Sequence, residues 1–264
     1  MTPRGRLLRG ALIGALALSA LAPMAVLVLA SLGRDWFFPV LWPSRLTLES
    51  WVSFLGGGRL GIAALTSVVL AIGTGVAACA VALPVGRALA RLEGWRRHLG
   101  AAAAFLPVAA PPIALGTGLQ VSLLTLGLGG TWTGVLLAHL VPAAGYASLY
   151  FLGVFTLFDG RIEEEARSLG ATRSQVLRRV TLPLLRRPLA EAFVLGFLIS
   201  WAQVPLTLLI GGGAVRTLPI EVFAYLQAGQ DRFAATGALL MIVPALLSLA
   251  AMRLAARQTE VAAL

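Results

Sequence analysis

Few side chains in this sequence could carry out covalent chemistry. His139 with Ser122 or Ser148 is the pairing that could activate a hydroxyl nucleophile, but none of them has the spacing of a nucleophile elbow. Cys79 is the only cysteine in the sequence, which excludes a disulfide framework or a cysteine-based metal cluster. The sequence also contains no lysine, so it has no phosphate-binding loop ending in Gly-Lys-Ser or Gly-Lys-Thr. We therefore expect no catalytic residue, no metal and no cofactor held by this chain.

The composition is that of an integral membrane protein. Apolar residues make up 58% of the chain and charged residues only 12%, whereas a soluble domain has roughly 45–50% and about 25%. The mean hydropathy is +0.88. The net charge of +10 would suggest nucleic acid in a soluble protein. In a bilayer, however, arginines fix the orientation of the chain, so we expect a lipid partner and no nucleic acid.

The hydrophobic segments predict an all-α, polytopic fold. A helix needs roughly 20 apolar residues to cross about 30 Å of hydrocarbon. Six segments are long enough: about 8–32, 61–85, 99–126, 131–157, 189–210 and 233–252. The first is longer than the apolar core of a signal peptide and lacks a clear cleavage site, so we expect it to be retained. The sequence thus predicts one transmembrane domain over residues 1–264.

The arginines predict which side of the membrane each loop occupies. With the N-terminus inside, 16 of the 21 arginines fall in inside segments and five in outside segments. Positive charge is enriched on the cytoplasmic side of membrane proteins. We therefore expect both termini, and the loop 158–187, to be cytoplasmic.

The membrane segments contain helix breakers but no charge near their middle. Pro107, Pro111 and Pro112 are expected to break the third span, Pro142 the fourth and Pro205 the fifth. The absence of central Asp, Glu or Arg disfavours a secondary carrier or channel, which is the main alternative function. Polar and aromatic residues beside the breaks are candidates for lining a translocation pathway, with packing as the competing interpretation: Gln120, His139, Tyr146, Trp201 and Gln203.

The loop between the fourth and fifth spans has the punctuation of two short helices. Asp159 is a suitable N-cap, and Gly170 fits the left-handed position after the end of a first helix. Thr172 followed by Gln175 is the pattern of a capping box for a second helix. Pro183 is expected to end that second helix. The sequence therefore predicts a helix–glycine–helix elbow.

Apolar residues recur in this loop at intervals of three, four and seven and predict one stripe along it. The stripe consists of Ile162, Ala166, Leu169, Val176 and Val180. An amphipathic connector resting on the inner leaflet and a docking element for a cytoplasmic partner both fit this pattern.

The same loop resembles the EAA loop of binding-protein-dependent ABC importer permeases. The family pattern is Glu-Ala-Ala, three residues, Gly, nine residues, Ile, one residue and Leu-Pro. All of its intervals occur here, at Glu164, Glu165, Ala166, Gly170, Val180, Leu182 and Pro183. Glu165 replaces the first Ala of the pattern, and Val180 replaces Ile. The six-span layout also matches the type I importer arrangement.

This resemblance implies a permease subunit of the bacterial inner membrane, in which the elbow couples to ATPase subunits. The implied partners are a second permease subunit, related but different, two ATP-binding cassette subunits and an extracytoplasmic substrate-binding protein. ATP and Mg would then be bound by the ATPase, consistent with the lack of lysine in this chain. Within the family, the sequence looks most like permeases for polyamines, ferric iron and thiamine.

Overall fold

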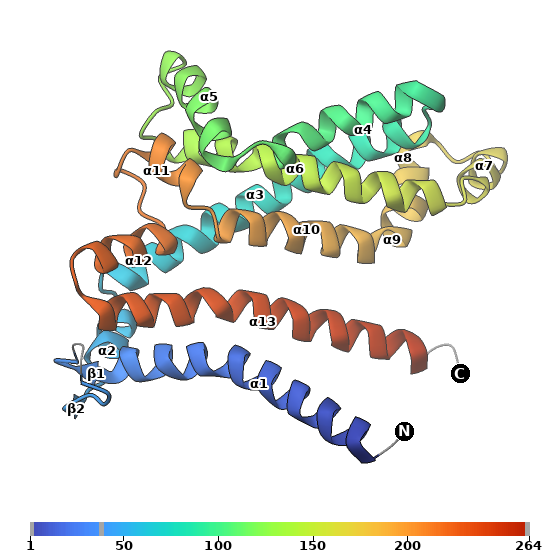
Figure 1. Cartoon of the computed structure of the whole chain (residues 1–264). Helices are drawn as coiled ribbons and strands as arrows, with labels where there is room; N and C mark the ends of the chain where they lie inside the picture. Colours follow the sequence, from blue (N-terminus) through green and yellow to red (C-terminus); the bar gives the residue numbers. More distant parts are fainter. Residues whose placement is uncertain (1–2, 37–39, 262–264) are drawn as a thin grey trace. The chain divides into compact units, whose positions relative to one another are not determined.

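The computed structural model describes residues 3–36 and 40–261, and most of them lie in helices (Figure 1). The long helices are α1 (Pro3–Leu32), α3 (Arg59–Ala90), α6 (Trp132–Leu157) and α13 (Asp231–Val261). The shorter ones are α2 (Glu49–Leu55), α4 (Gly94–Ala109), α5 (Pro112–Thr125), α7 (Arg161–Ser168), α8 (Arg173–Val176), the π-helix η1 (Leu177–Thr181), α9 (Leu182–Leu184), α10 (Arg186–Trp201), α11 (Pro205–Gly211) and α12 (Leu218–Gln227). Strands β1 (Gly33–Arg34) and β2 (Arg45–Leu46) form one short antiparallel pair. Apart from this strand pair the fold is all-α, as the hydrophobic segments predict.

The chain divides into two compact units, which are described separately. Unit 1 comprises residues 1–64 and 218–264, and unit 2 comprises residues 65–217. Helix α3 begins in unit 1 and continues into unit 2.

Among the described residues, four helices are long and apolar enough to cross a membrane by themselves: α1, α3, α6 and α13. Two further spans are possible if each of two bent helix pairs counts as one. Helices α4 and α5 meet at 96°, and α10 and α11 meet at 62°. Figure 1 shows α5 turning sharply away from the line of α4. These elements coincide with the six segments that hydropathy selects.

Prolines explain both bends, but the expected break in the fourth span is wrong. Pro111 and Pro112 lie at the α4–α5 bend, and Pro205 opens α11. Pro142, by contrast, is buried inside the continuous helix α6, and Pro107 lies inside α4. A proline removes one backbone donor, and a membrane helix can continue through that loss where a neighbouring helix packs against it.

Glycines allow the helices of unit 2 to pack closely. A Cβ added at Gly86 on α3 would lie 2.4 Å from Cβ of Phe151 on α6. Where α3 meets α10, a Cβ at Gly75 would lie 2.9 Å from the carbonyl oxygen of Phe193, and one at Gly196 would lie 3.1 Å from Cα of Gly75. Small residues at such contacts are the usual means by which membrane helices approach each other. Helix α3 therefore approaches both α6 and α10 closely.

In unit 1, polar contacts join α2, α3, α12 and α13. Arg59 at the start of α3 lies 2.9 Å from the carboxylate of Glu221 on α12, which is 2% exposed. The hydroxyl of Thr236 on α13 donates to that of Ser50 on α2 at 2.9 Å, and both residues are buried. Because buried polar groups need partners, these pairs fix the register between the helices they join.

Candidate functional site

The elbow, defined as α7, α8 and the turn between them, begins one residue away from the expected position. Gly160, and not Asp159, occupies the N-cap of α7. The Asp159 carboxylate instead accepts a hydrogen bond from the backbone N–H of Arg161 at 3.0 Å. Its negative charge still lies at the helix start, where the helix dipole favours it.

Gly170 ends α7 in the predicted left-handed conformation, with φ of +88°. The N–H of Gly170 donates to the carbonyl of Arg167 at 2.9 Å, and that of Ala171 donates to the carbonyl of Ala166 at 3.0 Å. This pair of hydrogen bonds is a Schellman motif. The predicted conformation of Gly170 is therefore confirmed. Glycine is favoured at this position because a residue with a Cβ is strained at a positive φ.

The predicted capping box at the start of α8 is also present. The Thr172 hydroxyl accepts from the backbone N–H of Gln175 at 3.3 Å, and the Gln175 side chain accepts from the N–H of Thr172 at 2.7 Å. With a motif on each side, the turn from Leu169 to Thr172 sets the angle between the two helices.

Pro183 does not end the second helix, and this prediction is wrong. The π-helical turn η1 ends at Thr181, two residues before Pro183. The N–H of the next residue, Leu182, bonds to the carbonyl of Leu177, five residues back. This change of register accommodates a residue that lacks an N–H. The chain then continues through α9, which contains Pro183, towards α10.

The feature that the sequence did not reveal is a buried ion pair between the elbow and α3. Glu163 is 4% exposed, and its carboxylate accepts hydrogen bonds from the Arg87 guanidinium and from the Thr181 hydroxyl, the latter at 2.6 Å. Burial alone would raise the pKa of Glu163. The hydrogen bonds from Thr181 and Arg87 and the positive charges of Arg87 and Arg167 outweigh burial and lower the pKa. We call these three residues the clasp.

The apolar stripe predicted along the elbow is divided between two faces. Val176 is 2% exposed, but Ile162 and Leu169 are 43% and 89% exposed. Glu164 and Glu165 are exposed beside them. The elbow therefore presents an outer face on α7 that combines apolar and acidic side chains, which suits contact with another protein. The other residues of the predicted motif, Ala166, Val180 and Leu182, are half-buried.

Of the candidate pathway residues, His139 has the most defined surroundings. It is fully buried on α6, with Nδ1 2.9 Å from the Ser200 hydroxyl and Nε2 2.8 Å from the Thr207 hydroxyl. Thr207 donates its one hydrogen to the carbonyl of Gln203 at 3.0 Å. It must therefore accept from Nε2–H, which leaves Nδ1 to accept from Ser200. His139 is thus fully satisfied as a neutral ring that ties α6 to both sides of the α10–α11 bend.

The other candidates occupy different settings. Gln120 on α5 donates to the carbonyl of Leu209 on α11 at 2.9 Å. Trp201 is 5% exposed and stacks on Phe197 with ring centroids 6.0 Å apart, whereas Tyr146 is 41% exposed. The structure thus brings His139, Gln120 and the Gln203 backbone to α11. Their role as pathway residues remains a prediction.

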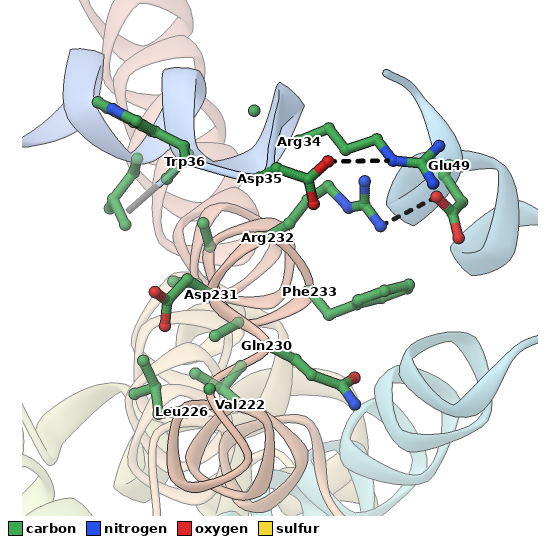
Figure 2. A pocket seen from close by; sticks show the side chains of 17 residues that line it. Arg34, Asp35, Trp36, Glu49, Val222, Leu226, Gln230, Asp231, Arg232 and Phe233 are labelled. Atoms are coloured by element: carbon green, nitrogen blue, oxygen red, sulfur yellow. Dashed lines mark hydrogen bonds and ion pairs between the residues drawn. The ribbon is translucent and has the colours of Figure 1, made fainter. Parts of the chain in front are cut away.

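A cavity of about 700 Å³ lies in unit 1 (Figure 2). Its apolar wall is formed by Leu27, Ala30, Val222, Leu226, Ala235 and Ala238. Its other wall is charged, and Figure 2 shows two ion pairs there. Arg232 lies 2.9 Å from the Glu49 carboxylate, and Arg34 lies 3.8 Å from that of Asp35. Charges of both signs line this wall, which the sequence pattern did not predict.

Comparison with known proteins identifies the class. The fold matches that of a bacterial ABC transporter involved in the import of the acidic polysaccharide alginate, with a TM-score of 0.71, 17% identity and coverage of 96% of this chain and 98% of that chain. A second structure of the bacterial alginate ABC transporter, in complex with an alginate pentasaccharide-bound periplasmic protein, gives a TM-score of 0.68 at 16% identity, covering 97% of this chain and 96% of that one. The fold is that of a type I ABC importer permease.

Sequence comparison then gives the family. Residues 82–261 match the family model of the binding-protein-dependent transport system inner membrane component, and the chain belongs to this family. It is a transport permease of the inner membrane with several spans, not an enzyme. This membership argues against the secondary carrier or channel, which the sequence alone left open as the alternative function.

Three relatives illustrate the breadth of the similarity. The putative 2-aminoethylphosphonate transport system permease protein PhnV of Salmonella typhimurium is 32% identical over 247 residues, which are 92% of this chain and 90% of that protein. The spermidine/putrescine transport system permease protein PotC of Escherichia coli is 26% identical over 255 residues, 96% and 95% of the two chains. The inner membrane ABC transporter permease protein YnjC of Escherichia coli is 31% identical over 153 residues, which are 58% of this chain and 30% of YnjC.

Proposed function

We propose that this permease forms a substrate pathway with a second, related permease subunit and that its elbow docks into an ATP-binding cassette subunit. The observation that carries the proposal is the elbow itself. Its turn is fixed by the Schellman motif at Gly170 and the capping box at Thr172, while Glu164, Glu165 and Leu169 face outward. A rigid element with an exposed apolar and acidic face can transmit the motion of a bound partner.

The remaining partners follow from this role. ATP and Mg would be bound by the two cassette subunits, because this chain has no lysine from which to build a phosphate-binding loop. With 16 of 21 arginines on the elbow side, we place the elbow and both termini in the cytoplasm. The charged cavity wall of unit 1 then faces outward, where both signs of charge suit contact with a substrate-binding protein.

The cargo is proposed to be a small solute, with selectivity residing mainly in the binding protein. Similarity to PotC and PhnV supports cargo that carries an amino group, as spermidine, putrescine and 2-aminoethylphosphonate do. Polyamine is therefore a leading proposal, with thiamine and ferric iron as the others from the family resemblance.

Co-purification of the cognate ATP-binding subunit with tagged permease tests the docking role. Gly170→Val should abolish co-purification, because valine cannot adopt φ of +88° without distorting the elbow. Gly127→Val is the matched control: Gly127 has φ of +70°, and an added Cβ at either glycine meets nothing within 4 Å. Gly127 lies outside the elbow, so its variant should retain the ATPase. If Gly170→Val permease has an unchanged size-exclusion profile and still co-purifies with normal amounts of the ATP-binding subunit, the proposal is contradicted.

A further inference from the structure

We infer that the ion pair between Arg87 and Glu163 carries the movement of the elbow to α3, so that the elbow and the helices of unit 2 move as one body. This inference rests on the proposed function, because it assumes that the elbow is moved by an ATPase. Arg87 and Glu163 are thus positioning residues for coupling, and neither is expected to touch the ATPase.

The burial of the three consecutive glutamates separates their roles. Glu163 is buried, whereas Glu164 and Glu165 are exposed. Successive residues of a helix point about 100° apart, so one turn of α7 can direct Glu163 inward and present its neighbours outward. The inward carboxylate is held by two donors, Arg87 and Thr181. Glu163 therefore belongs to the attachment of the elbow rather than to its docking face.

The ion pair joins segments that are distant in the chain. Arg87 and Glu163 are 76 positions apart, and the covalent connections of the elbow run to α6 on one side and to η1 on the other. Arg87 also lies over the ring of Phe155 on α6, 5.7 Å from its centroid. A single guanidinium thus ties the end of α3 to both α6 and α7.

Apolar packing does not fill this junction. A cavity of about 250 Å³ lies there, lined by residues that include Arg87, Arg91, Phe155, Phe158, Glu163 and Arg167. Because space remains between α3, α6 and α7, directed contacts must set their separation there. The charge-assisted hydrogen bond between Arg87 and Glu163 is stronger than one between neutral groups.

Beyond the clasp, α3 is packed tightly enough to pass the motion on. The Gly86–Phe151 contact joins it to α6, and the Gly75–Gly196 contact joins it to α10. The covalent route from the elbow to α10 contains the π-helical turn η1, and Thr181 in that turn is itself held by Glu163. Loss of the ion pair would therefore leave the elbow attached but free to turn relative to α3.

Distance measurements in the assembled complex test this inference. Spin labels would be placed at Ala88, exposed at the end of α3, and at Ser174, exposed on α8, with Cys79→Ala removing the native thiol. Permease with Arg87 and Glu163 intact should give a narrow distance distribution that shifts by less than about 2 Å when a non-hydrolysable ATP analogue closes the ATPase. Glu163→Gln should broaden this distance distribution, or shift its maximum by about 5 Å, the length of one helical turn.

Control variants separate the possible causes. Arg87→Met should act like Glu163→Gln, and Arg87→Lys should keep the distribution narrower than Arg87→Met does, because lysine keeps the charge but not the planar guanidinium. Arg91→Gln removes an arginine one turn further on and should have no effect. If Glu163→Gln does not fold, the comparison of Arg87→Met with Arg87→Lys makes the same test.

Two failures can be told apart. A Glu163→Gln or Arg87→Met complex that retains its ATPase and the narrow distribution overturns the role of the ion pair. If permease with the clasp intact does not retain the ATP-binding subunits, the proposed docking function fails, and the inference that rests on it fails too.

Discussion

Nε2 of His139 on α6 lies 2.8 Å from the hydroxyl oxygen of Thr207 on α11, although the two residues are 68 positions apart in the chain. With Ser200 on α10 as its second partner, His139 fixes both sides of a 62° bend. Helix breaks of this kind need polar partners because a membrane provides none. The helices on both sides of the bend thus share the imidazole of His139 as a hydrogen-bond partner.

We expect His139→Leu to destabilise the permease by about 1–3 kcal/mol, because it leaves two buried hydroxyls without their shared partner. Thermal unfolding in detergent measures this loss. His98→Gln is the control, since His98 is exposed and its ring contacts only the local carbonyl of Gly94 at 2.8 Å among the described interactions. Equal unfolding temperatures for His139→Leu and the unsubstituted protein would show that the bend does not depend on this residue.

Gly86→Ala should be destabilising by about 1–3 kcal/mol through overpacking. The new methyl group would lie 2.4 Å from Cβ of Phe151 and 2.8 Å from the backbone nitrogen of Leu152, neither of which can move easily. Gly153→Ala on α6 is the matched control, because an added Cβ there meets nothing within 4 Å. Its unfolding temperature should stay the same or rise, since alanine favours helix. Similar losses in both variants would argue against a close α3–α6 contact.

The clasp should weaken in acid. The pKa of Glu163 lies below its ordinary value of 4.5 in the folded protein, so the carboxylate is fully ionised and stabilising above that value. This stability is lost as pH falls through the lowered pKa. Hydrogen exchange at the elbow, compared between wild type and Glu163→Gln, measures the effect.

The difference in elbow protection should be large near neutral pH and vanish below the lowered pKa. Comparing the two proteins at each pH removes the intrinsic pH dependence of exchange. A difference that stays constant across this range would mean that ionised Glu163 does not hold the elbow.

Cysteines introduced at Arg45 and Arg178 should be labelled from opposite sides of the membrane. Both positions are exposed, and the arginine distribution predicts that Arg45 lies outside and Arg178 inside. A membrane-impermeant maleimide applied to intact cells, in a Cys79→Ala background, should modify the first and not the second. Modification of both from outside would refute the proposed orientation.

Sequence predicted the turn of the elbow but not the N-cap of α7 or the contact that attaches the elbow to α3. Gly170, Thr172 and Gln175 act on hydrogen bonds within a few residues, so their types and spacing suffice. Glu163 acts through Arg87, far away in the chain, and three consecutive glutamates give no sign of which one is buried. An arginine at the end of an apolar span was the only available signal.

The prolines show the same limit of prediction from sequence. Pro111 and Pro205 lie at bends as predicted, because the structure on both sides changes direction there. Pro142 and Pro183 lie in continuing helical paths, where packing or a π-helical turn compensates for the missing N–H. Tertiary packing and a change of hydrogen-bond register cannot be read from a single residue type.

Photo-crosslinking at Leu169 in the assembled transporter tests the docking role most directly. Leu169 is 89% exposed on the elbow, and a photoreactive residue there should crosslink to the ATP-binding subunit. The same residue in place of Leu55, 81% exposed on α2, should give no such product, because the proposed orientation places it outside. A crosslink from Leu169 alone is the expected result; efficient crosslinking from Leu55, or none from Leu169 in a complex that retains its ATPase, would contradict the coupling role of the elbow.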